Sequence, residues 1–266
     1  RRGEEVLAWT LGHNPIAESD EWRAMTVRLV VPFGVTSFTP RLTGYGPSQV
    51  WLADWKFEKL GKVPVLDPKG QPWTLKNKLI NVQISPGSLA MKVKDLRNGK
   101  EWTQEEAAGG LIASSAKAEG NLLQIRAFGS GSHQPITLTC SLAQEKAEVD
   151  IKLEGQPNAD LDVIDFPPAF VSQENTVFYV PLNMGIRWEA KDKRVSDQWL
   201  PGWSGHGLCM GFWGAQEDSS SVLAIVKDLD DFMLRLSRGK DGLLTACPAW
   251  HGEKRKMGYP RRLTYC

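Results

Sequence analysis

A β-hairpin is predicted by "SPGSLAMKVKDLRNGKEWTQ", residues 85–104. Apolar and polar side chains alternate over residues 89–94, which is the period of a half-buried strand. The dipeptide Asn98-Gly99 predicts a two-residue type I′ turn, because that turn needs φ > 0 at both central positions. The second strand includes Trp102, and a broad aromatic side chain at a strand end fits the thick core of a sandwich of two sheets.

Short β-rich runs recur along the rest of the chain and are separated by turn-forming residues. Their spacing of about 8–12 residues is typical of an all-β sandwich. Helix signals are few, and "TQEEAAGG", residues 103–110, is too short and too rich in glycine to form a stable helix. We therefore expect an all-β fold built as a large antiparallel β-sandwich. The expected strands lie within 25–45, 49–57, 60–73, 78–84, 89–95, 110–114, 121–128, 135–142, 147–153, 177–182, 207–214, 221–227, 232–237 and 243–250.

The chain of 266 residues is long enough for one large β domain or two ordinary ones. We expect a division near residue 76. Residues 1–76 hold five of the eleven tryptophans and are predicted to be a β-rich N-terminal segment or a partial domain. Residues 77–266 carry a continuous series of strands and are predicted to form the sandwich. Within them, the apolar and proline-containing segment 155–170 predicts a crossing between sheets.

Composition excludes several classes of function. The formal net charge of +1 argues against a dedicated nucleic-acid binder, which usually carries a large basic surplus. No apolar run approaches the ~20 residues that a membrane-spanning helix needs, so we expect no membrane span. The four histidines show no metal-ligand spacing. We expect neither a metal nor another cofactor.

The four cysteines are widely spaced and contain no C-x-x-C pair. Two disulfides and free thiols both remain open, and buried free thiols are favoured because no dense disulfide framework is present. These residues are Cys140, Cys209, Cys247 and Cys266.

Motifs for catalysis are incomplete. "GWSGHG", residues 202–207, has histidine where a G-x-S-x-G nucleophile elbow needs its last glycine. "DLDDF", residues 228–232, offers paired carboxylates, but adjacent Asp230 and Asp231 would point to opposite faces of a strand. We interpret this segment as a solvated turn at the entry of a strand.

A group of aromatic residues suggests sugar binding. Four tryptophans fall within 26 residues: Trp188, Trp199, Trp203 and Trp213. Indole faces pack on the apolar faces of pyranose rings, and the loop at 194–207 combines tryptophan with polar side chains. The alternative is that these indoles fill the core of the sandwich, which is expected for Trp213.

The candidate sugar contacts follow from this loop. Trp199 and Trp203 would stack on the sugar, and Asp197 and His206 would bond its hydroxyl groups. The two tryptophans have an even balance between a core position and a surface position.

Several motifs resemble the N-terminal supersandwich of large glycoside hydrolases, closest to the endo-α-N-acetylgalactosaminidase and α-N-acetylgalactosaminidase group. In that family a strand pair of the form "l-x-V-x-D-x-r-t-G-k-x-W" is typical, and Asp95, Gly99 and Trp102 occupy the matching places. The resemblance covers about residues 77–266. Further similar segments are "DFPPAF" (165–170), "FYVPLNMGIRW" (178–188), "CMGFWGAQEDSSSVLAIVKDLDDFML" (209–234) and "YPRRLTY" (259–265).

The resemblance implies a galactose-mutarotase-like fold that precedes a (β/α)₈ barrel with two catalytic carboxylates. It implies that this chain is a non-catalytic N-terminal module whose partners are a glycan and a C-terminal catalytic barrel of the same parent polypeptide. It also implies a secreted or periplasmic location. Two other classes of function remain open. One is a stand-alone carbohydrate-binding protein, and the other is a mutarotase-like enzyme or lyase that uses His206 or His251 with Glu253.

Overall fold

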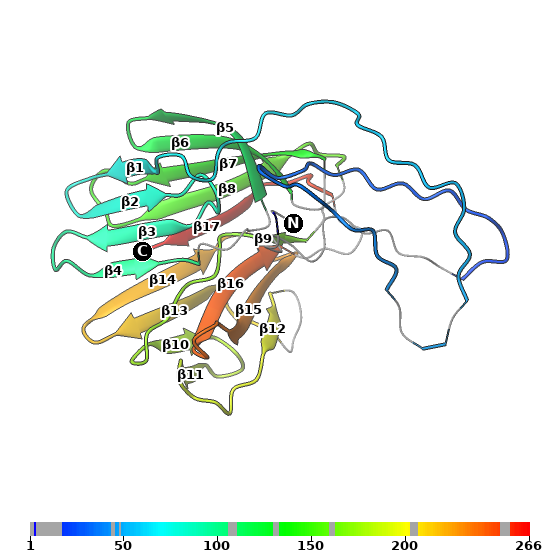
Figure 1. Cartoon of the computed structure of the whole chain (residues 1–266). Helices are drawn as coiled ribbons and strands as arrows, with labels where there is room; N and C mark the ends of the chain where they lie inside the picture. The colour runs from blue at the N-terminus through cyan, green and yellow to red at the C-terminus, as the bar shows by residue number, and fades with distance from the viewer. Residues whose placement is uncertain are drawn as a thin grey trace.

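The protein is all-β in the residues that its computed structural model describes (Figure 1). These residues are 3, 18–43, 46–47, 49–105, 111–129, 133–159, 163–202, 207–250 and 256–266. They contain seventeen strands and no helix. The strands form one nine-stranded sheet and two four-stranded sheets, and every pairing between them is antiparallel. The all-β sandwich predicted from the strand spacing is confirmed.

The nine-stranded sheet has the order β11-β10-β13-β14-β17-β8-β7-β6-β5. Its strands form because their side chains alternate between the core and the outside. In β7, for example, Ile136, Leu138, Cys140 and Leu142 are all buried on one face. The strand bounds are β5 (Leu111–Glu119), β6 (Leu122–Gly129), β7 (Pro135–Leu142), β8 (Val149–Gly155), β10 (Val177–Val180), β11 (Ile186–Glu189), β13 (Phe212–Glu217), β14 (Ser220–Val226) and β17 (Arg261–Tyr265).

The two four-stranded sheets have the orders β1-β2-β3-β4 and β12-β15-β16-β9. Their strands are β1 (Trp73–Lys76), β2 (Ile80–Ile84), β3 (Met91–Asp95), β4 (Glu101–Thr103), β9 (Ile164–Asp165), β12 (Gln198–Pro201), β15 (Phe232–Arg238) and β16 (Leu244–Trp250). The chain passes from β8 in the large sheet to β9 in a small one, so the crossing predicted over 155–170 is confirmed.

A short seam joins the two small sheets edge to edge. The N–H of Phe170 donates to the carbonyl of Ala246 in β16 at 2.8 Å. The N–H of Val171 donates to the carbonyl of Thr103 in β4 at 3.0 Å. Through this seam, residues 169–171, the two small sheets form one layer opposite the large sheet.

The core between the layers contains an aromatic cluster. Trp102 of β4 lies with its ring centroid 5.6 Å from that of Phe170 in the seam. Phe170 in turn lies 5.9 Å from Trp213 of β13, and Trp213 lies 6.2 Å from Tyr265 of β17. Trp213 has no exposed surface, so its predicted place in the core is confirmed. The tryptophan at the end of the hairpin therefore connects the small layer to the large sheet.

The predicted hairpin is formed by β3 and β4, but its turn is not the predicted one. The N–H of Asp95 donates to the carbonyl of Lys100 at 2.8 Å, so four residues lie in the loop. Only Gly99 in this loop has positive φ, at 78°. The prediction of a two-residue type I′ turn is wrong because side chains hold a longer loop. The Asp95 carboxylate accepts the N–H of Arg97 at 2.9 Å, and the Asn98 side-chain oxygen accepts the N–H of Lys100 at 2.9 Å.

The strands expected in the N-terminal part are absent from its described residues. Between residues 18 and 72 no described residue belongs to a strand, and in Figure 1 this segment runs away from the sheets and returns. Residues 73–76, the end of the expected N-terminal segment, instead form β1 of the sandwich. The sequence has the side-chain pattern of strands here, but strands need paired neighbours. The segment contacts the large sheet where the N–H of Leu66 donates to the carbonyl of Ala113, at 2.9 Å. The division of the chain near residue 76 stays a prediction.

All four cysteines are free thiols. Cys140 and Cys247 are buried, as expected, and burial raises the pKa of each thiol to about 12. Cys209 and Cys266 are exposed, so the prediction of buried thiols is wrong for these two. Cys209 lies between β12 and β13, and Cys266 follows the last residue of β17, so neither side chain is inside the core. The part of the chain that the structure describes has no helix able to cross a membrane.

Candidate functional site

The described sugar-contact candidates lie on an edge strand. Trp199 is in β12, the edge of the small sheet β12-β15-β16-β9, and 50% of its surface is exposed. Asp197 precedes the strand and is also exposed. The strand alternates, so Leu200 points into the core while Trp199 points outward. The balance between core and surface is thereby settled for Trp199, which is a surface residue.

The other candidates cannot be placed beside them. Trp203 and His206 lie outside the described residues. The same holds for His251 and Glu253, which were considered for a mutarotase-like site. The sugar-contact assignment of all four loop residues therefore stays a prediction.

Trp199 has a cation over its ring. The guanidinium carbon of Arg235 lies 5.4 Å from the ring centroid. The two residues are paired across β12 and β15, so their side chains share one face of the sheet. Arg235 also donates to Asp165 at 3.4 Å. An indole held by such a cation keeps its position and presents a defined aromatic surface.

Arg238 of β15 holds the loop between β11 and β12 through hydrogen bonds to its backbone carbonyls. The Arg238 guanidinium donates to the carbonyls of Ala190 at 3.1 Å, Val195 at 2.9 Å and Gly242 at 2.9 Å. It also donates to the carbonyl of Asp192. Three of these carbonyls belong to the loop, and the fourth, that of Gly242, lies between β15 and β16, so one guanidinium ties the loop to that turn. This role of Arg238 was not predicted from the sequence, where it is the second arginine of the strand FMLRLSR.

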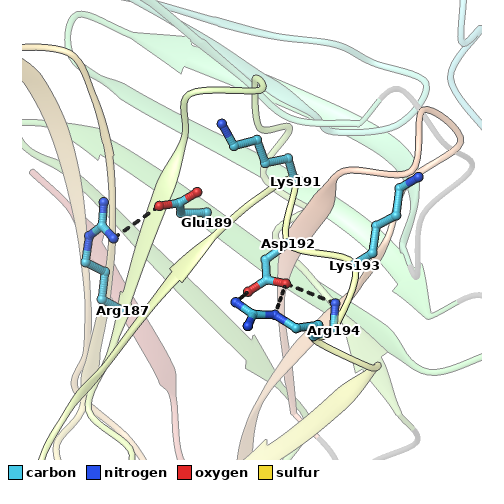
Figure 2. Close-up of a pocket in the computed structure, with 6 residues that line it drawn as sticks. All are labelled: Arg187, Glu189, Lys191, Asp192, Lys193 and Arg194. Atoms are coloured by element: carbon cyan, nitrogen blue, oxygen red, sulfur yellow. Dashed lines mark hydrogen bonds and ion pairs between the residues drawn. The ribbon is translucent and has the colours of Figure 1, made fainter.

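This loop and strand β11 line a pocket of about 410 Å³ whose walls are entirely charged (Figure 2). The lining residues are Arg187, Glu189, Lys191, Asp192, Lys193 and Arg194. We call them the charged loop. The charges of this stretch were not predicted to form a site from the sequence.

Two ion pairs lie within the charged loop. Arg187 donates to Glu189 at 3.3 Å. Arg194 donates twice to Asp192, at 2.9 Å and 2.8 Å. Hydrogen bonds from the side chain of Arg194, and then from its backbone N–H, lower the pKa of Asp192 to about 2. Asp192 is therefore ionised throughout the ordinary pH range.

The aspartates of residues 228–232 do not form a free carboxylate pair. Asp231 is fully buried and accepts hydrogen bonds from Arg261 at 2.7 Å and 3.1 Å. Asp228 accepts two from Arg262, at 2.9 Å and 3.0 Å. The expected solvated turn is therefore wrong for Asp231, because a buried arginine from β17 lies beside it. Asp230 is exposed, but both aspartates precede β15, so the expectation that they face opposite sides of a strand stays untested.

No group of three or more His, Cys, Asp or Glu able to hold a metal ion occurs in the described part of the chain. The expectation that the protein uses no cofactor stays a prediction.

No family model matches the sequence, and no curated protein matches it either. Solved structures do resemble it. The ligand-free α-N-acetylgalactosaminidase NagBb from Bifidobacterium bifidum is similar with a TM-score of 0.58 and 10% identity, over 73% of this chain and 35% of that chain. Its GalNAc complex is similar with a TM-score of 0.58 and 11% identity, over 73% and 36%. This chain shares its sandwich fold with that glycosidase.

A galactose mutarotase related enzyme from Lactobacillus acidophilus is also similar, with a TM-score of 0.47 and 9% identity over 73% of this chain and 96% of that chain. The similarity to NagBb confirms, for the fold, the resemblance that the hairpin and the later motifs indicate. The chain spans about a third of the length of NagBb, at 35%.

Proposed function

We propose that this chain is a non-catalytic β-sandwich module of a glycoside hydrolase that acts on glycans. In this proposal it supports a catalytic barrel of the same parent polypeptide. The observation that carries the proposal is the similarity to the α-N-acetylgalactosaminidase NagBb over 73% of this chain and only 35% of that enzyme. A fold hosts many functions, so the proposal depends also on the side chains present.

Two aspartates of the segment 228–232 support a non-catalytic role. Glycoside hydrolysis needs two carboxyl groups placed on either side of the scissile bond. Asp228 and Asp231 are both engaged by arginines, and Asp231 is buried away from any ligand. The core instead supplies rigidity, because Trp102, Phe170 and Trp213 couple the two layers. A rigid sandwich of this kind is suited to brace a neighbouring domain.

We expect the purified 266-residue chain to show no turnover of aryl glycosides, including p-nitrophenyl N-acetyl-α-galactosaminide. The physical reason is that Asp228 and Asp231, in the segment that offered paired carboxylates, are held by arginines and are not available as an acid and a nucleophile. Release of nitrophenol is the measurement. The control is the product of the same gene extended past Cys266, assayed at the same molar concentration, which should be active. Turnover by the 266-residue chain that Asp230→Asn removes would contradict the proposal, and so would an extended product inactive on every glycoside.

A second candidate function is sugar binding by the exposed face of β12. The observation that favours it is Trp199, half exposed and held beneath the guanidinium of Arg235. An exposed indole at a sheet edge can stack on a pyranose ring, with a gain on the order of 1 kcal/mol. The resulting affinity for a single sugar would be weak.

We expect Trp199→Ala to lower stability by no more than about 1 kcal/mol, because the indole is half exposed and its cation–π contact with Arg235 lies at an exposed site. Leu200→Ala is the matched control in the same strand and should cost about 2–5 kcal/mol, because it removes a buried side chain. Urea denaturation measures both variants. Retention on immobilised N-acetylgalactosamine then tests binding. A Trp199→Ala variant that is as unstable as the control would make the indole a packing residue, and unchanged retention would exclude it as a sugar contact.

A further inference from the structure

The charged loop carries an excess of positive charge that its own acids do not balance. Arg187 is paired with Glu189, and Arg194 is paired with Asp192. Lys191 and Lys193 have neither a hydrogen bond nor an ion pair to any described residue. Figure 2 shows both lysine side chains extending away from the ion pair of Asp192 and Arg194. The two side chains leave the loop in different directions, so their ammonium groups are free to contact separate anionic groups.

The backbone that carries these lysines is fixed. The N–H of Ala190 donates to the carbonyl of Thr176 at 2.9 Å, and the carbonyl of Ala190 accepts the N–H of Leu244 at 2.9 Å. Arg238 bonds the carbonyls on both sides of Lys191 and Lys193. The two lysines thus project from a rigid support, and less conformational entropy is lost when they bind a ligand.

The walls of the pocket restrict the class of ligand. Most small-molecule pockets are lined by apolar side chains with a few polar groups. This pocket of about 410 Å³ has only charged walls, so a drug-like or lipid tail would gain little there. Lysine ammonium groups act as point charges toward anionic oxygens. The lining suits a ligand that carries separate sulfate or carboxylate groups, one for each lysine.

The number of cations separates a glycan from a nucleic acid. Nucleic-acid binders neutralise a long run of phosphates, about 6–10 in typical complexes, and stack aromatic rings on bases. Two free lysines cannot supply such a run, and the lining contains no aromatic residue. A sugar chain with one or two acidic substituents needs only two cations to neutralise them.

We propose that the charged loop is a binding site for an acidic glycan, and that Lys191 and Lys193 contact its sulfate or carboxylate groups. The choice of a glycan as the carrier rests on the proposed function. Arg238 is a positioning residue in this site, because it touches the loop backbone and not the ligand.

Fluorescence anisotropy with labelled oligosaccharides of equal length tests the site. The probes are a heparin hexasaccharide with sulfates and carboxylates, a hyaluronan hexasaccharide with carboxylates alone, and neutral chitohexaose. The wild type should bind one or both acidic probes and not chitohexaose. The comparison of heparin with hyaluronan distinguishes sulfate from carboxylate as the bound group.

The variant Lys191→Ala/Lys193→Ala should bind the acidic probe about tenfold more weakly, because it loses two charge contacts. The matched control is Lys76→Ala/Lys78→Ala, which removes the same charge from two exposed lysines two residues apart near β1. It should change the dissociation constant by less than about threefold, since distant charges are screened by salt. Both variants should melt at the wild-type temperature, because all four lysines are exposed.

Three outcomes would overturn the site: equal losses in the two double variants, no binding of either acidic probe, or tighter binding of an oligonucleotide of equal charge through the same lysines. Each readout is binding by the chain alone. It is therefore independent of whether the extended gene product hydrolyses a glycoside, and the two proposals can fail separately.

Discussion

Asp231→Ala should lower the free energy of unfolding by about 3–5 kcal/mol, because it leaves a buried arginine without its counter-charge. Asp231 and Arg261 have no exposed surface, and their closest atoms are 2.7 Å apart. The other Arg261 donors are bound to the carbonyls of Tyr259 at 2.8 Å and Lys256 at 3.0 Å. These bonds keep the guanidinium in place after the carboxylate is lost. The charge then stays buried and unbalanced.

Urea denaturation measures this effect, and Asp228→Ala is the matched control. Asp228 belongs to the same turn and pairs with Arg262, whose side chain is 48% exposed. Loss of that pair should cost less than about 1 kcal/mol, as for other exposed pairs. The double variant Asp231→Leu/Arg261→Met should recover much of the stability, since a buried pair can be replaced by apolar residues of similar volume. Equal midpoints for Asp231→Ala and Asp228→Ala would contradict the assignment of a buried ion pair.

Trp213→Ala should cost about 3–5 kcal/mol, the usual range when a large buried aromatic is truncated. The indole lies 5.9 Å from Phe170, 6.3 Å from Phe178 and 6.2 Å from Tyr265, between ring centroids. Its removal would leave a cavity where the seam meets the large sheet. The indole N–H has no hydrogen-bond partner in the described residues, so the loss arises from packing and not from a polar contact.

Thermal unfolding followed by near-ultraviolet circular dichroism measures the Trp213 variants. Trp213→Phe should recover part of the loss, because a phenyl ring keeps contacts with its neighbours while leaving a smaller cavity. A Trp213→Ala variant that unfolds within a few degrees of the wild type would show that the aromatic cluster contributes little.

Local patterns in the sequence predicted the fold class well. Alternation over residues 89–94 and the turn residues after them were enough to predict a hairpin. A hairpin joins two strands that are adjacent in the sequence, so nearby residues determine it. The turn type was not predicted, since Asp95 and Asn98 bond the backbone with their side chains. The seam at residues 169–171 was also not predicted. It depends on a contact between Phe170 and Ala246, which are far apart in the chain.

The difference between local patterns and distant contacts also explains why the strands expected between residues 25 and 73 are absent from the described residues up to 72. Their side-chain pattern is that of strands, but a pattern does not supply a partner. Val30 is the one apolar residue that is buried among the described residues from 18 to 72. Trp51 and Trp55 are 69% and 60% exposed. Whether a strand finds a partner depends on distant parts of the chain, so it cannot be predicted from a local pattern.

The candidate site was predicted in part. The segment 194–207 was predicted as a loop, but residues 198–201 form β12, and the alternation in this strand explains why the indole of Trp199 faces outward. The burial of Asp231 was missed because its partner is 30 residues away. Lys191 and Lys193 were missed because a short run of mixed charges usually marks a solvated surface. Their significance comes from the pairing of neighbouring acids with arginines, which only the side-chain geometry shows.

The position of β17 has a consequence for synthesis of the protein. This last strand lies between β14 and β8 in the middle of the nine-stranded sheet. The meander from β5 to β8 can pair as soon as it leaves the ribosome, and so can the hairpin of β13 and β14. These two halves have no hydrogen bonds to each other within the sheet until residues 261–265 emerge. Translation must therefore reach the end of this segment before the sheet closes, and until then two strand edges stay open to chaperones and to neighbouring nascent chains.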